Sequence, residues 1–113
     1  MIIKKIKWKN HNNWNNCKVL EYPDFSKNFG IATANIIGRY PEKWFCVNHK
    51  CEQIYILQKW DIEIFTENKR DKLEIWDVYY FNKNEKYYVT SKWCEVLIIN
   101  TPTWNPEQSE YLD

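Results

Sequence analysis

The side chains most able to do chemistry gather between Gly38 and Leu57 of this 113-residue chain. Two short apolar runs there flank a cluster of polar and sulfur side chains, Cys46, Asn48, His49, Cys51 and Glu52. A thiol, an amide, an imidazole and a carboxylate can bind a polar ligand, transfer protons or hold a metal. A carboxylate at the start of a buried strand is costly unless it is paired or bound. Glu52 is therefore the first candidate functional residue, with a salt bridge or hydrogen bond at the strand start as the alternative.

Alternation along an extended strand sorts these side chains. Cys46 and Asn48 lie two residues apart, so they should share a face. His49 is out of phase with them and is expected in a surface loop, although it could turn inward as a metal ligand or general base. Cys46 is expected to act as a small buried hydrophobe, because no histidine stands beside it in sequence to activate a nucleophile.

The elements that position these residues are predicted to be strands. Short runs rich in β-branched and aromatic residues, separated by turn residues, indicate about ten strands and no helix longer than a turn. We expect strands at 17–22, 31–37, 44–48, 53–58, 61–65, 72–76, 78–81, 87–90 and 94–100. Residues 1–8 are expected to form a first strand or extended arm, 11–16 a loop, and 107–113 a helical turn or tail. Such a pattern is typical of a sandwich or barrel.

Alternation also predicts which aliphatic side chains form the core of this barrel. They are Ile54, Ile56, Ile62, Ile64, Leu73, Ile75, Val96 and Ile98.

Composition limits the class of protein. A chain of this length fits one domain, residues 1–113. Sixteen Lys and Arg against fifteen Asp and Glu give a net charge of +1, which argues against a nucleic-acid partner. No signal peptide or membrane-spanning run is visible, so we expect a cytoplasmic protein with no membrane partner and reduced cysteines. Cys46 and Cys51 could form half of a zinc site, but no second pair stands at suitable spacing.

The order of these elements resembles a small single-domain cupin. Cupins carry a first motif with a glycine, a His-x-His pair at a strand end and a Glu a few residues later. Here Gly38 opens the stretch, Cys46 and Asn48 fall where the two His would be, and Glu52 falls on the Glu. Ile54–Leu57 matches the strand that follows.

The second cupin motif is also matched in outline. Trp76-Asp77 stands where that motif begins, Asn82–Asn84 replaces its turn, and Tyr87 falls on the third His. Thr101–Trp104 resembles the Pro-rich segment that often follows the last strand. The resemblance implies an all-β fold, a single antiparallel jelly-roll β-barrel of the double-stranded β-helix type. Of the four usual metal ligands only Glu52 remains, so we expect no metal and no cofactor.

The resemblance further implies a pocket in the barrel mouth. In the cupin register Glu52 and Tyr87 join Cys46 and Asn48 on one face, around a ligand. This mixture of side chains suits a sugar or another hydroxyl-rich small molecule. The leading hypothesis is a metal-free small-molecule-binding protein.

Three alternatives remain open at this point. A carbohydrate isomerase or epimerase would use Glu52 or His49 with Tyr87 as its acid and base. A metalloenzyme would use Glu52, His49 and a Cys as ligands. A structural or partner-binding dimer would have a filled barrel. The aromatic residues and the edge strands expected of an open jelly roll favour a homodimer.

Overall fold

The computed structural model describes residues 1–23 and 25–113. The strands are β1 (Lys9–Asn12), β2 (Cys17–Glu21), β3 (Gly30–Tyr40), β4 (Phe45–Asn48), β5 (Glu52–Trp60), β6 (Ile62–Thr66), β7 (Arg70–Leu73), β8 (Val78–Phe81), β9 (Tyr87–Thr101) and β10 (Ser109–Leu112). Two short 3₁₀ helices, η1 (Lys5–Lys7) and η2 (Pro106–Gln108), complete the described elements. No helix in these ranges is long and apolar enough to cross a membrane.

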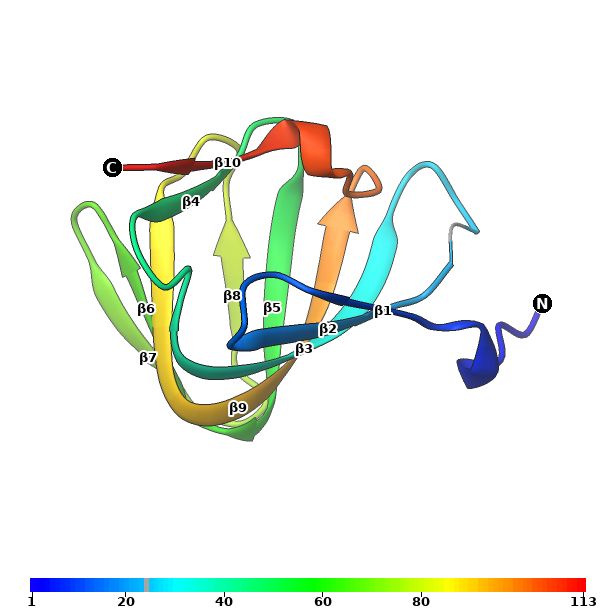
Figure 1. The fold of residues 1–113 in the computed structure, drawn as a ribbon, viewed down its shortest axis with the longest axis horizontal. Helices are drawn as coiled ribbons and strands as arrows, with labels where there is room; N and C mark the ends of the chain where they lie inside the picture. Colours follow the sequence, from blue (N-terminus) through cyan, green and yellow to red (C-terminus); the bar gives the residue numbers. More distant parts are fainter. Residues whose placement is uncertain (24) are drawn as a thin grey trace.

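The strands form one curled antiparallel sheet, which confirms the predicted jelly-roll β-barrel. Along one path the order is β1-β2-β3-β9-β4-β10, while β5 and β6 also pair with β9. Figure 1 shows β9 bent into a U that crosses the lower end of the barrel and rises along both walls. The first part of β9 pairs with β6 and the last part with β5, whereas β3 follows most of its other edge. Strand β9 therefore connects both walls.

A bulge in β3 helps the sheet to curl. The register between β3 and β9 shifts between Ile36 and Gly38, and Gly38 has a φ of +79°. Glycine takes this left-handed conformation without the steric cost that a Cβ brings, and a bulge increases local bending and twist.

The core contains five of the eight aliphatic residues predicted for it, Ile62, Ile64, Leu73, Val96 and Ile98. The prediction is wrong for Ile54 and Ile56, whose strand β5 buries Gln53, Tyr55 and Leu57 instead. Pairing with β9 decides the face, because residues directly opposite each other lie on the same side of a sheet.

The registered pairs on β5 make this clear. Tyr55 lies opposite Ile98 and Leu57 opposite Val96, so Tyr55 and Leu57 face inward with their partners. Ile75 is also misassigned: it is 50% exposed in the connection between β7 and β8.

The N-terminal strands differ from expectation too. The polar segment predicted as a loop contains part of β1, which pairs with β2 so that His11 lies opposite Val19. Residues 109–112 form strand β10 along β4, where a turn or tail was expected. Both segments contribute side chains to the pocket described next.

Candidate functional site

A pocket opens inside the barrel between β1, β2, β5 and the segment that follows β9. The polar and aromatic side chains that line this inner pocket are those of His11, Asn13, Glu21, Tyr40, Cys46, Asn48, Gln53, Tyr55, Tyr87, Asn100, Trp104 and Ser109, and Cys17, Val19, Ala32 and Ile98 complete the lining. The pocket and the open solvent at its mouth together occupy about 460 Å³, but the cavity volume is only about 40 Å³. That cavity has room for a few water molecules. A larger ligand must therefore fill mainly the mouth.

Gln53 is the centre of the polar network in this pocket. Its Oε1 accepts hydrogen bonds from the Tyr87 hydroxyl at 3.1 Å and from Asn48 Nδ2 at 3.4 Å. Its Nε2 donates to Asn100 Oδ1 at 2.8 Å. All four side chains are buried. Their mutual bonds offset much of the cost of removing these polar groups from water.

Asn48 connects this network to the rim. Its Oδ1 accepts from Gln108 Nε2 at 2.9 Å and from Trp104 Nε1 at 3.2 Å. Gln108 belongs to η2, just before β10. The amide of Asn48 therefore holds the indole of Trp104 and the C-terminal segment against the barrel.

The inner wall carries hydroxyl and thiol groups that remain neutral. Burial is the largest cause that raises the pKa values of Tyr40, Tyr55 and Tyr87 well above 10.0. Burial likewise raises the pKa of Cys46 above 9.0, against hydrogen bonds that lower it. These groups therefore meet a ligand as O–H and S–H, which disfavours Cys46 as a thiolate nucleophile.

The mouth contains a histidine–carboxylate pair that the sequence analysis missed. His11 Nδ1 lies 3.5 Å from Glu21 Oε1, and both side chains are about one-third exposed, at 33% and 34%. The His11 ring stacks on Trp104 with 6.2 Å between centroids and 11° between planes. The signal that could have found the pair is a hairpin: two short strands joined through Asn13–Asn16 would put residues 11 and 21 on neighbouring strands.

The structure brings together three of the sequence-predicted site residues. Cys46, Asn48 and Tyr87 all line the inner pocket. Glu52 does not, and its expected place on their face is wrong. The phase of β5 turns Glu52 outward, where its carboxylate accepts a hydrogen bond that raises the pKa of Tyr80. Gln53, one residue later, takes the inward position.

His49 also lies outside the pocket, in the exposed connection between β4 and β5. Its Nδ1 is 2.8 Å from Asn84 Oδ1 and its Nε2 is 2.7 Å from Glu110 Oε2. The hydrogen bond to Asn84, followed by that to Glu110, raises the pKa of His49 above 6.5. These contacts join the β4–β5 loop and the β8–β9 loop to β10. They agree with the expectation that His49 lies in a surface loop.

The residues present do not fit a metal centre of the cupin kind. Within residues 1–23 and 25–113, no three His, Cys, Asp or Glu side chains are grouped to hold an ion. Cys46, Asn48 and Tyr87 occupy three of the four expected ligand positions, and Tyr87 and Asn48 are already engaged with Gln53. The fourth, Glu52, faces away from them.

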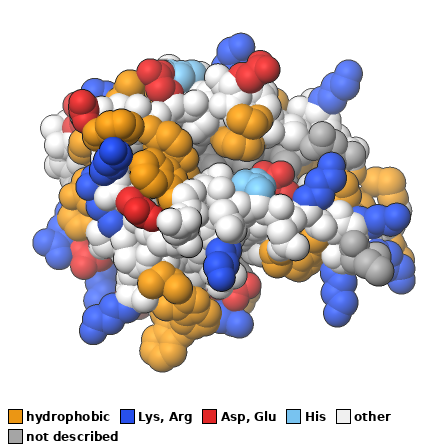
Figure 2. All heavy atoms as spheres, viewed as in Figure 1, with side chains coloured by type: hydrophobic (Ala, Val, Ile, Leu, Met, Phe, Trp, Pro, Cys, Tyr) orange, Lys and Arg blue, Asp and Glu red, His pale blue; other side chains and the backbone are white. Residues whose placement is uncertain are grey.

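Lys and Arg side chains occur at several separate places on the face in Figure 2, and Asp and Glu lie among them over most of it. A phosphate backbone is bound by a continuous basic surface, which this face does not present.

Comparisons with known proteins give structural matches alone. No family model matches the chain, and no curated protein matches its sequence. Streptomyces PAC13, solved with uridine, superimposes with a TM-score of 0.87 over 99% of this chain and 89% of its own, at 8% identity. PAC13 is described as a nucleoside dehydratase.

Two further solved structures are similar in fold. KdgF from Halomonas sp. has a TM-score of 0.72 at 9% identity, covering 90% of this chain and 94% of its own. A cupin-2 domain protein from Shewanella frigidimarina has a TM-score of 0.59 at 14% identity, covering 69% and 74%. At such low identities the shared property is the architecture of the barrel.

Proposed function

Because this chain has the small cupin jelly-roll fold, we propose that it binds an uncharged small molecule rich in hydroxyl or amide groups. A nucleoside or a sugar is the class that we favour. The observation that carries the proposal is the network around Gln53, which places three side-chain amides and a phenol in one pocket of an otherwise apolar barrel. Such convergence of few polar groups in an apolar concavity is typical of ligand sites.

The network still has hydrogen-bonding capacity for a ligand. Among the described residues, Asn100 Nδ2 donates no hydrogen bond, whereas Asn100 Oδ1 accepts one from Gln53 Nε2. Asn100 lines the inner pocket. Its N–H groups can therefore donate to a ligand carbonyl or hydroxyl oxygen.

The size of the pocket suggests how such a ligand would lie. A small polar group fits the cavity of about 40 Å³, and the rest of the ligand would occupy the mouth. The rings of Trp104 and His11 stack on each other at that mouth, so a base or a sugar ring would pack on a face that this pair turns outward. The binding of uridine by PAC13, a protein of similar fold, supports the choice of a nucleoside as first probe.

The test is titration calorimetry with uridine and with a neutral monosaccharide such as glucose. We expect binding by the native chain and a loss of about tenfold or more in affinity for Asn100→Ala, since a ligand hydrogen bond is lost. Asn35→Ala is the matched control, because Asn35 lies on the outer face of β3. Equal losses in both variants, or binding unaffected by Asn100→Ala, would contradict the proposal.

A second candidate function is acid–base catalysis on the same class of ligand. The pair His11–Glu21 favours it, because a carboxylate 3.5 Å from Nδ1 can orient the ring and leave Nε2 to accept a proton. For the isomerase or epimerase hypothesis, His11 replaces Glu52 and His49 as the base. Tyr87 would serve as the acid only by turning its hydroxyl from Gln53 Oε1 to the substrate. Incubation with aldoses in D₂O tests it: enzyme-dependent deuterium incorporation beside the carbonyl, lost in His11→Gln, would support catalysis.

A structural role remains the alternative to ligand binding, and the small volume of the interior cavity favours it.

Whether or not a ligand binds, we propose that the protein is a homodimer. The outer faces of β5 and β8 carry apolar side chains, including Val78 at 57% and Tyr80 at 47% exposed. An exposed apolar face can meet its own copy across a two-fold axis.

Two further proposals concern the state of the protein. We propose that the protein binds no metal tightly, because Cys46, Asn48 and Tyr87 are not the donor set of a cupin metal site. Elemental analysis that finds stoichiometric Zn, Fe, Mn or Ni would overturn this proposal.

We also propose a cytoplasmic location. Four cysteines present as free, buried thiols support a reducing compartment.

A further inference from the structure

We infer that the site has two parts, an inner pocket and an adjoining side pocket, and that it selects the uncharged ligand over its phosphate ester. The inference rests on the proposed function and specifies its substrate class. It follows from how the two pockets meet and from which charges line them.

The side pocket adjoins the inner pocket along shared side chains. It is lined by Tyr22, Gly30, Ile31 and Thr103, together with four residues that also line the inner pocket, Glu21, Ala32, Asn100 and Trp104. Its cavity volume is about 30 Å³, so, like the inner pocket, it has room for a few water molecules. A ligand with two linked parts, such as a base and a ribose, can therefore lie across the two mouths and direct one small polar group into each pocket. Asn100 and Glu21 then face the link between them.

The side-chain charge at the junction of the two pockets is negative, which disfavours an anionic ligand. Among the described residues lining the two pockets, none is Lys or Arg. Glu21 is the single carboxylate, and the one imidazole, His11, is paired with it. A phosphate in either pocket would lie near Glu21 without a cation to neutralise it. Like charges brought together without a partner weaken binding strongly.

The interior is neutral as well. The amides of Asn48, Gln53 and Asn100 form hydrogen bonds with one another and with neutral neighbouring side chains, and the neighbouring phenols stay protonated. Amides and hydroxyls offer both donors and acceptors to an uncharged ligand. None of them supplies the full positive charge that a phosphate dianion requires.

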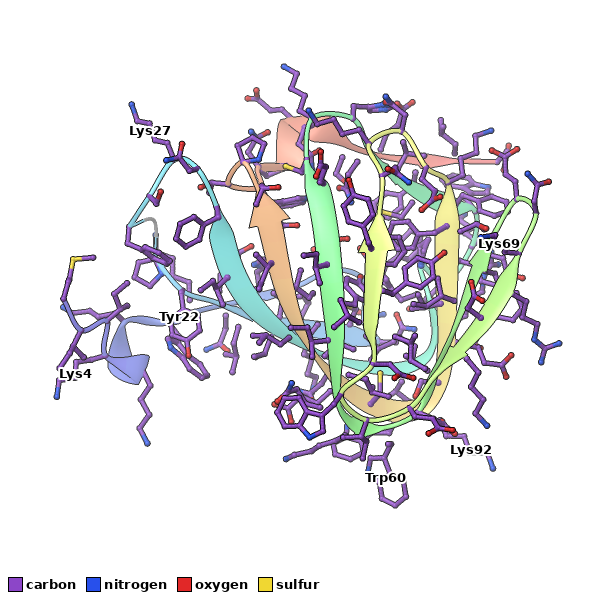
Figure 3. The ribbon with its side chains drawn as sticks, turned by 180° about the vertical axis from the view of Figure 1, so that it is seen from behind. Lys4, Tyr22, Lys27, Trp60, Lys69 and Lys92 are labelled. Atoms are coloured by element: carbon purple, nitrogen blue, oxygen red, sulfur yellow. The ribbon has the colours of Figure 1, made fainter. Side chains whose placement is uncertain are left out.

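One lysine, Lys27, lies just beyond the two pockets and is a candidate cation for a ligand phosphate. Lys27 helps to line a third pocket, which shares Thr103 and Trp104 with the side pocket. Figure 3 shows Lys27 at the tip of the loop between β2 and β3, away from the strands of the barrel. A phosphate could gain from this lysine only by reaching out of both pockets.

The experiment compares two matched pairs of probes by calorimetry at fixed pH and ionic strength: uridine with uridine 5′-monophosphate, and glucose with glucose 6-phosphate. We expect each phosphate ester to bind at least about tenfold more weakly than its parent. Glu21→Gln should reduce the ratio of the parent's affinity to the ester's affinity. Higher salt should also reduce this ratio, because it screens the repulsion between Glu21 and the phosphate. Lys27→Ala is the control variant and should leave the ratio unchanged.

The outcomes separate the inference from the proposed function. If the parent compounds bind but the esters bind as tightly or more tightly, the inference is wrong and the proposed function stands. A ratio unchanged in Glu21→Gln would overturn the role of Glu21 and the inference with it. If no member of either pair binds, the proposed function is wrong for both ligand classes. The inference, which rests on that function, is then overturned with it.

Discussion

The Tyr87 hydroxyl donates a hydrogen bond to Gln53 Oε1 at 3.1 Å, and Gln53 Nε2 donates to Asn100 Oδ1 at 2.8 Å. Tyr87 and Asn100 lie near opposite ends of β9. A straight strand would separate them by roughly 40 Å, at about 3.3 Å per residue. One glutamine side chain reaches both because β9 is bent into a U (Figure 1). The bend of this strand therefore creates the polar centre of the pocket.

The first prediction concerns this bridge. Tyr87→Phe removes the hydroxyl and leaves Gln53 Oε1 with the long contact to Asn48, so it should cost about 1 kcal/mol of unfolding free energy. Urea denaturation measures the change. Tyr88→Phe is the control, because Tyr88 points outward and stacks on Phe65 at 4.6 Å between centroids. A loss as large in Tyr88→Phe would contradict the assigned network.

The second prediction tests the phase of β5. Leu57 is fully buried and Ile56 faces outward, so Leu57→Ala should cost about 2–5 kcal/mol and Ile56→Ala clearly less. Both variants remove aliphatic carbons from adjacent residues of one strand, which makes them a matched pair. Denaturant unfolding of both decides the matter. A larger loss for Ile56→Ala would reverse the assigned orientation of the strand.

The third prediction concerns His49 and pH. Its pKa is raised first by the hydrogen bond to Asn84 and then by Glu110. The raised value means that protonation stabilises the folded state below the unfolded pKa of about 6.5, and this contribution is lost as pH rises through the folded pKa. The effect on stability should be small, because His49 is exposed.

NMR titration of His49 measures its pKa directly. Asn84→Ala and Glu110→Gln should each lower the value towards 6.5. A native pKa at or below 6.5 would count against the two hydrogen bonds.

The fourth prediction concerns the thiols. Burial raises the pKa of Cys17 to about 12 and raises the pKa values of Cys46 and Cys94. Because the thiolate is the reactive form, these groups should react slowly with a disulfide reagent at pH 8 in the native protein and readily after denaturation. Comparison with Cys46→Ala assigns any fast phase. One rapid equivalent missing from that variant would show Cys46 to be accessible and activated.

The fifth prediction tests the proposed homodimer. A stable interface usually buries about 800 Å² per partner, so the exposed apolar side chains of β5 and β8 would have to meet their copies. Val78→Lys should shift light scattering towards the monomer, whereas Asn68→Lys, in the exposed loop between β6 and β7, should not. A native chain that is monomeric at high micromolar concentration would contradict the dimer.

Another apolar surface lies at the lower end of the barrel. Trp60 is 66% exposed and points away from it in Figure 3, with its ring 6.1 Å from that of Trp93. If Val78→Lys leaves a dimer intact, Trp60→Lys tests this surface next. Dissociation by that variant alone would place the contact at the barrel end.

The sequence by itself was sufficient for the class of fold and for part of the site. Alternation and turn residues are local signals, so they predicted an all-β barrel and most of its strands. They also put Cys46 and Asn48 on one face, and the cupin order brought Tyr87 to them. All three line the inner pocket.

Tertiary structure alone decided which face of β5 points inward. Both faces of β5 carry apolar side chains. Alternation could therefore place Ile54 and Ile56 on one face, but it could not tell whether that face points into the barrel or outward. Pairing with β9 turned Gln53 inward and Glu52 outward. The pair His11–Glu21 likewise depends on the pairing of β1 with β2, and its place beside Trp104 depends on a segment more than eighty residues away. Local patterns specify which residues share a face; contacts between distant segments specify what that face meets.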